Sequence, residues 1–134
     1  MPSDNETMLV TAAVAASKRA YAPYSRFVVG AAVCSSDGRI YTGSNVENAS
    51  FGLSMCAERS AVFAAVGAGH RRLTTIVIYT PTNTATTPCG ACRQVLREFG
   101  PGTLAIVCVC DAPERRRFTL QSLLPEAFGP ESLA

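Results

Sequence analysis

Three cysteines and one glutamate in this sequence have the types and the spacing of a catalytic metal site. Cys56 and Glu58 lie two residues apart, Cys89 follows Cys56 by 33 residues, and Cys92 follows Cys89 by three. Thiolates bind Zn²⁺, and three protein ligands leave a coordination position for water, whereas structural zinc usually has four. A carboxylate close to a ligand can carry protons to and from that water. These residues therefore predict a hydrolytic zinc centre.

Two other interpretations of the cysteines remain open at this point. Cys-x-x-Cys also occurs in thiol redox proteins, although a redox pair has no use for a third cysteine followed by Ala-Glu. A non-catalytic, zinc-stabilised binding module would need a fourth ligand, for which Cys34, Cys108 and Cys110 are available. Each lies in an apolar segment, where a free cysteine is usually a small buried hydrophobe. His70, the single histidine, is predicted to be a solvated loop residue.

The surroundings of the four residues support metal chemistry. Both cysteine blocks fall at predicted helix starts, where unpaired N–H groups favour the thiolate. Three thiolates on a dication leave a net charge of −1, and Arg59 is the nearby side chain that could offset it. Phe27 and Phe51 are expected to line the cleft, and burial there would raise the pKa of Glu58.

The elements that must position these groups follow from hydrophobic periodicity and turn residues. The apolar face of the first expected helix is mostly alanine, so this helix can approach its neighbour closely. Ser54 is the predicted N-cap of the second helix, and Thr87 that of the third, with Pro88 in its first turn. Helices are expected at 3–20, 54–65, 88–99 and in part of 120–128, and strands at 27–34, 39–43, 73–79, 104–110 and 117–119. This order predicts an α/β sandwich around a mixed sheet.

The totals exclude several classes of protein. With 134 residues, 48% of them hydrophobic and 16% charged, the chain is expected to form a single domain over residues 1–134. A net charge of +2 gives no reason to expect nucleic acid, and the basic run 115–117 is expected to be a solvated loop. No segment resembles a signal peptide or a membrane span, so a cytoplasmic enzyme without a membrane partner is predicted.

Five segments together resemble one enzyme family. Cys-Ala-Glu at 56–58 and Pro-Cys-Gly-Ala-Cys-Arg at 88–93 are similar to the zinc motifs of the cytidine deaminases, specifically the small homotetrameric type. Segments 21–30, 43–48 and 123–128 resemble the base-pocket, ribose-binding and C-terminal segments of that family. The similarity covers roughly residues 9–128. It implies a three-layer α/β/α sandwich around a mixed five-stranded sheet, and zinc-dependent hydrolysis of cytidine and deoxycytidine to uridine and deoxyuridine with release of ammonia.

The resemblance also implies a role for each matching residue. Zn²⁺ would be bound by the three cysteines, with Glu58 as the proton carrier and Arg59 bonded to cysteine sulfur. The substrate-binding residues would be Phe27 against the pyrimidine, Asn45 and Glu47 at the ribose, the backbone of Ala57 at the base, and Phe128 reaching a neighbouring subunit's site. A homotetramer is therefore expected.

Two departures from the family pattern, Ser44 and Phe51, stand where cysteine and tyrosine are frequent. Phe51 lacks a hydroxyl group, which puts one hydrogen bond near the pocket in doubt. A related deaminase acting on another aminopyrimidine, such as a nucleoside antibiotic of the blasticidin type, is the nearest alternative. A nucleotide deaminase is less favoured because no Gly-rich phosphate loop is present. The sequence does not rank cytidine against deoxycytidine, or salvage against detoxification.

Overall fold

A mixed five-stranded sheet forms the middle layer of the computed structural model, which describes residues 4–133. The sheet order is β2-β1-β3-β4-β5, in which β3 and β4 are parallel and every other neighbouring pair is antiparallel. The strands are β1 (Gly30–Ser35), β2 (Ile40–Ser44), β3 (Leu73–Tyr79), β4 (Ala105–Val109) and β5 (Arg115–Thr119). The parallel β3–β4 pair is joined by the crossover that carries the second cysteine block.

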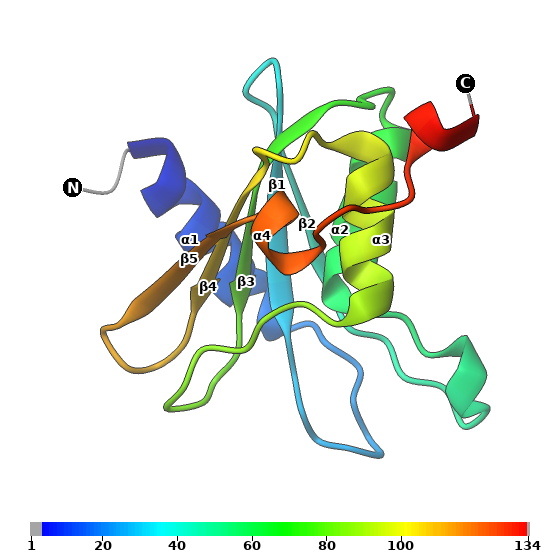
Figure 1. The fold of residues 1–134 in the computed structure, drawn as a ribbon. Coiled ribbons are helices and arrows are strands. Elements are labelled where there is room, and N and C mark those ends of the chain that lie inside the picture. Colours follow the sequence, from blue (N-terminus) through cyan, green and yellow to red (C-terminus); the bar gives the residue numbers. More distant parts are fainter. Residues whose placement is uncertain (1–3, 134) are drawn as a thin grey trace.

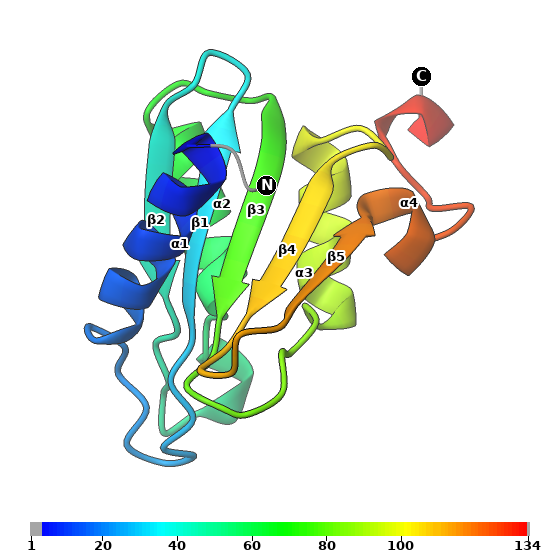
Figure 2. The same ribbon diagram turned by 90° about the vertical axis from the view of Figure 1, so that its left-hand side faces the viewer.

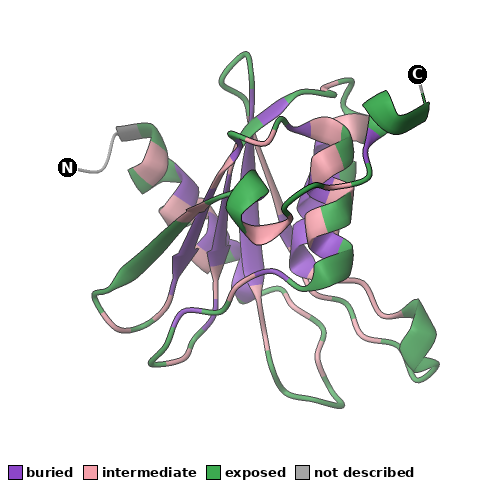
Figure 3. Cartoon of the chain, in the orientation of Figure 1, coloured by how far each residue is buried: buried purple, intermediate pink, exposed green. Residues whose placement is uncertain are grey.

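Helices cover both faces of this sheet (Figures 1 and 2). One face packs against α1 (Asp4–Ser17), and the other against α2 (Ala57–Gly67) and α3 (Gly90–Phe99). The short elements are η1 (Phe51–Leu53), α4 (Leu120–Leu123) and η2 (Pro130–Leu133). Buried residues concentrate on β1, β3 and β4 and on the sides of the helices that face the sheet (Figure 3). The predicted three-layer α/β/α sandwich is confirmed, and no helix among the described residues is long and apolar enough to cross a membrane.

Two glycines allow the helices to lie directly on the sheet. A Cβ added at Gly30 on β1 would lie 1.9 Å from the backbone oxygen of Ala13 on α1. A Cβ at Gly43 on β2 would lie 2.4 Å from the backbone nitrogen of Ala61 and 2.6 Å from the backbone oxygen of Ala57, both on α2. The alanine-rich face of the first helix thus packs closely, as its composition predicts, and α2 is seated on β2 with no side chain between them.

Several predicted boundaries differ from the structure. The first strand begins at Gly30 and not at Phe27, because the N–H of Val29 bonds to the side chain of Asn45 and not to a neighbouring strand. The run 115–117 is not a solvated loop: it forms most of β5, and Arg115 and Arg117 both pair with Glu6 on α1. The first helix ends at residue 17, and its predicted start at residue 3 lies outside the described residues.

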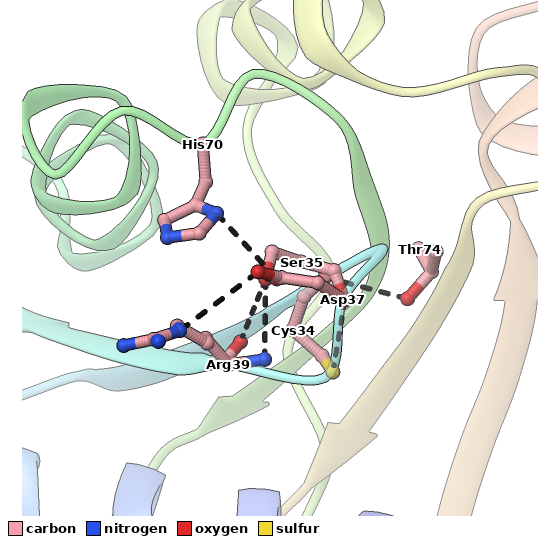
Figure 4. Close-up of polar contacts among 6 residues, drawn as sticks. All are labelled: Cys34, Ser35, Asp37, Arg39, His70 and Thr74. Carbon is pink, nitrogen blue, oxygen red and sulfur yellow. Dashed lines mark hydrogen bonds and ion pairs between the residues drawn. The ribbon is translucent and has the colours of Figure 1, made fainter.

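His70 is also not the solvated loop residue that the sequence predicts. Its ring lies 5.4 Å from the ring of Tyr41, and its Nδ1 lies 3.4 Å from the carboxylate of Asp37. That carboxylate also accepts a hydrogen bond from Ser35 and lies 3.8 Å from Arg39 (Figure 4). These contacts join the β1–β2 turn to the α2–β3 loop.

Candidate active site

The three cysteines meet because two helices begin at the same end of the molecule (Figure 1). Cys56 is the N-cap residue of α2, and Cys89 is the N-cap residue of α3. Cys92 follows in the first turn of α3 and is 1% exposed. The predicted caps Ser54 and Thr87 are therefore wrong by two residues each. The hydroxyl of Ser54 instead accepts a hydrogen bond from the N–H of Asn48.

The thiols have the spacing that a single zinc ion requires. Their sulfur atoms all lie within 4.8 Å of one another, with 4.0 Å between Cys56 and Cys89 and 3.4 Å between Cys89 and Cys92. Tetrahedral coordination with Zn–S bonds of about 2.3 Å places sulfur atoms roughly 3.8 Å apart. The two distances bracket that value. Among residues 4–133 this is the one group of three or more metal-binding side chains, and all six cysteines are free.

A cation also fits the charges around these sulfurs. Glu58 is 7% exposed, and burial raises the pKa of its carboxyl group. Burial and the nearby Glu58 carboxylate raise the pKa of the Cys92 thiol. The pKa of Arg59 is raised because its guanidinium donates to the sulfur of Cys56 at 3.4 Å. The Nε of Arg59 is buried with no hydrogen-bond partner among the described residues. Several acidic groups thus lie close together beside one cation, and a dication would stabilise their charged forms.

Candidate ligands outside this group have other surroundings. Cys34 and Cys108 are buried in strands, 3% and 0% exposed, and burial raises the pKa of Cys108 to about 11. The sulfur of Cys110 lies 3.7 Å from the backbone oxygen of Ala112. Within the described chain, therefore, no fourth protein ligand reaches the three thiols, and a coordination position is left for a small molecule.

A pocket of about 270 Å³ opens onto two of the thiols, those of Cys56 and Cys89. One part of its wall contains Glu58, Ala57, Cys56 and Cys89, and another part contains Phe27, Asn45 and Glu47. The lining is completed by residues to which the sequence assigned no role in the pocket: Ser25, Val29, Ser54, Met55, Ile78, Thr80, Thr86 and Thr87. For Thr80, Thr86 and Thr87, the signal in the sequence was the threonine-rich run before the second cysteine block. Of the six residues expected to line the cleft, touch substrate or shuttle protons within one chain, all except Phe51 therefore lie at a single cavity.

Asn45 and Glu47 also hold the loop that frames this pocket. The side chain of Asn45 accepts from the N–H of Val29 at 2.8 Å and donates to the backbone oxygen of Phe27 at 2.7 Å. One carboxylate oxygen of Glu47 accepts from the N–H groups of Tyr24 and Ser25, and the other accepts from the hydroxyl of Ser25. The Ser25 hydroxyl, above all, holds the pKa of Glu47 below its ordinary value.

Two aromatic residues lie away from this pocket. Phe51 was expected to line the cleft, but it is 75% exposed on η1 and its ring packs edge-on against Tyr24, with 6.1 Å between ring centroids. The expectation that Phe51 lines the cleft is therefore wrong. Phe128 is 61% exposed and does not line the pocket of its own chain. Its expected role in a neighbouring subunit stays a prediction.

Comparison with known proteins places this site in a family. The model of the cytidine and deoxycytidylate deaminase zinc-binding region matches residues 3–108. A cytidine deaminase of Mycobacterium tuberculosis is 46% identical over 133 residues, which cover 99% of this chain and 96% of that protein. The crystal structure of cytidine deaminase from Burkholderia pseudomallei is 47% identical and has a TM-score of 0.87, covering 91% of this chain and 98% of its own.

The fold and the three-thiol site thus define a zinc-dependent hydrolase, and the chain belongs to the cytidine and deoxycytidylate deaminase family. Its similarity within the family extends over the full length of small bacterial members. A cytidine deaminase of Halalkalibacterium halodurans is 42% identical over 126 residues, covering 94% of this chain and 96% of that protein. The M. tuberculosis crystal structure has a TM-score of 0.80 at 44% identity, covering 96% of this chain and 99% of its own.

Proposed function

We propose that this protein hydrolyses the C4 amine of cytidine and deoxycytidine, forming uridine or deoxyuridine and ammonia, in pyrimidine salvage. The observation that carries the proposal is the buried residue Glu58, which lines one pocket with two of the three thiols whose spacing fits zinc. Zn²⁺ held by Cys56, Cys89 and Cys92 would supply the Lewis acidity that activates water for attack on C4.

The chain's own contribution to the reaction is proton transfer by Glu58. Burial raises the pKa of this carboxyl group, so that it can both accept a proton from water and return one to the substrate. We assign it protonation of N3 and then of the leaving amine. Its position at the second residue of α2 places the carboxylate beside the thiol of Cys92.

Binding of the nucleoside is assigned to the rest of the pocket. Phe27 would contact the pyrimidine face, the backbone of Ala57 the base edge, and Asn45 with Glu47 the ribose hydroxyls. Both polar side chains already anchor the segment 24–29, so ribose would bind to the hydrogen-bonding capacity that these contacts leave free. Arg59 would stabilise the thiolate of Cys56 and does not need to touch substrate.

We further propose a homotetramer, in which Phe128 of one chain completes the pocket of another. Its exposed ring and its place in a C-terminal segment held by a bond from Gln94 to its backbone oxygen support this assignment. Phe128→Ala should raise KM for cytidine while zinc content stays unchanged, and light scattering should give four chains per particle. Six free cysteines agree with a cytoplasmic, reducing location.

The decisive experiment follows the ultraviolet absorbance of cytidine with metal-quantified protein, with Glu58→Gln alongside. The wild type should convert cytidine to uridine with about one zinc per chain. Glu58→Gln should keep its zinc and lose about 10²–10⁴-fold in kcat, the usual contribution of general acid–base catalysis. Full activity of that variant would remove Glu58 from the mechanism. No conversion by the zinc-loaded wild type would favour an antibiotic-type aminopyrimidine substrate, and failure there would favour a binding module.

A further inference from the structure

A set of threonine hydroxyls lies along the pocket wall between β3 and α3. Thr80, at the end of β3, lines the pocket together with Thr86 and Thr87. Thr80 is only 1% exposed. The Thr80 hydroxyl oxygen lies 2.8 Å from that of Thr82 and 3.4 Å from that of Thr86. A nearly buried hydroxyl group therefore connects two hydroxyl groups of the loop that leads to Cys89.

The donors and acceptors in this set can be assigned from proton counting. Each threonine hydroxyl has one proton to donate, and a carbonyl oxygen only accepts. Thr82 donates to the backbone oxygen of Thr84 at 2.7 Å, so in the contact between Thr82 and Thr80 the donor is Thr80. The proton of Thr80 is then in use, and Thr86 must donate to Thr80. The oxygen of Thr86 is left with lone pairs and no proton to offer the pocket.

We call Thr86, Thr80, Thr82 and the carbonyl of Thr84 the hydroxyl relay. Backbone hydrogen bonds fix it at the end of β3 and β4. The N–H of Thr80 donates to the backbone oxygen of Val109 at 3.2 Å. The N–H of Asp111 donates to the backbone oxygen of Thr82 at 2.9 Å. Because the relay is anchored to β4 and the turn after it, its direction is set before any ligand binds.

We propose that the hydroxyl relay makes Thr86 a hydrogen-bond acceptor in the pocket, which favours an aminopyrimidine over its keto product, with Thr80 as the positioning residue. The inference rests on the proposed function. The exocyclic amine of cytosine donates hydrogen bonds, whereas the oxygen that replaces it in uracil only accepts. An acceptor facing an acceptor makes no hydrogen bond, so the keto product binds more weakly than the amine. The relay would therefore promote release of the product.

Thr80→Val tests the proposal, because valine keeps the shape of threonine and removes the hydroxyl. The Thr86 hydroxyl would then be free to donate to the keto group of the product. The inhibition constant of uridine divided by the KM of cytidine should fall roughly fivefold, the effect of one hydrogen bond. Thr86→Val should lower the same ratio, and Thr80→Ser should restore it. Thr84→Val is the matched control, since its hydroxyl makes no hydrogen bond within residues 4–133 and its carbonyl is retained.

The outcomes separate this proposal from the proposed function. The relay would be overturned if Thr80→Val and Thr86→Val changed the inhibition constant of uridine and the KM of cytidine equally, or changed neither. It would also be overturned if Thr80→Ser behaved like Thr80→Val, because packing of the methyl group would then be the cause. If the wild type binds zinc but does not deaminate cytidine, the proposed function fails on its own. Calorimetry then tests the relay directly: the zinc-loaded wild type should bind cytidine more tightly than uridine, and Thr80→Val should lose that preference. Equal affinities in the wild type would overturn it.

Discussion

Substituting alanine for Gly43 should disturb the metal site from the opposite side of α2. The added Cβ would lie 2.4 Å from the backbone nitrogen of Ala61 and 2.6 Å from the backbone oxygen of Ala57. Ordinary contact begins at 3.4 Å, so α2 would have to move away from β2 by about 1.0 Å. Both opposing atoms belong to the helix backbone, and no side-chain rotation can relieve the overlap.

Such a movement would carry Cys56 and Glu58 with the start of α2, while Cys89 and Cys92 are held by α3. The 4.0 Å separation between the sulfurs of Cys56 and Cys89 would change by a distance that matters for coordination. A misplacement of about 1 Å can cost roughly 10²-fold in rate. We therefore expect kcat/KM for cytidine to fall by about 10²-fold and the unfolding free energy to fall by about 1–3 kcal/mol from overpacking.

The assay combines cytidine turnover, chemical unfolding and zinc retention against a competing chelator. Gly67→Ala is the matched control, because it changes the last residue of the same helix where an added Cβ meets nothing within 4 Å. That variant should keep the activity and zinc of the wild type. If Gly43→Ala also kept wild-type turnover and zinc affinity, the close seating of α2 on β2 would not position the site, and the reasoning would be refuted.

Two further predictions concern charged contacts. Arg115 and Arg117 lower the pKa of Glu6, so this carboxylate stabilises the fold above its unfolded pKa of about 4.3 and stops doing so as the pH falls through the folded value. Glu6→Gln should lower the unfolding free energy by about 1 kcal/mol at pH 7 and by almost nothing near pH 2, measured by urea unfolding; an equal loss at both pH values would contradict this. Arg59→Met should weaken zinc retention by about 10–100-fold in chelator competition, because the cation beside the Cys56 thiolate is lost. Unchanged retention would show that Arg59 only fills space.

Local sequence signals predicted most of the fold. The apolar run 73–79 coincides with β3, and the Ser-Ser-Asp-Gly turn joins β1 to β2 as expected. Boundaries were wrong where side chains competed with the backbone for hydrogen bonds, as at Val29, whose N–H is taken by Asn45. The run 115–117 was mistaken for a loop because it follows Pro113 and Glu114, which predict a turn, whereas its pairing with β4 and Glu6 is visible only in three dimensions.

The chemistry available to this protein follows from its sequence alone. Residue types and short spacings are local properties, so three thiols, a carboxylate two residues from one of them and an adjacent arginine could be identified without a structure. Tertiary packing selects the groups that share one cavity. Cys56 and Cys89 are 33 residues apart in the sequence, and the packing of α2 and α3 on the sheet brings their sulfur atoms to 4.0 Å. It also placed Phe51 outside the pocket and brought Thr80 and Thr86 into it, since side-chain direction and hydroxyl pairing depend on neighbours that are distant in the sequence.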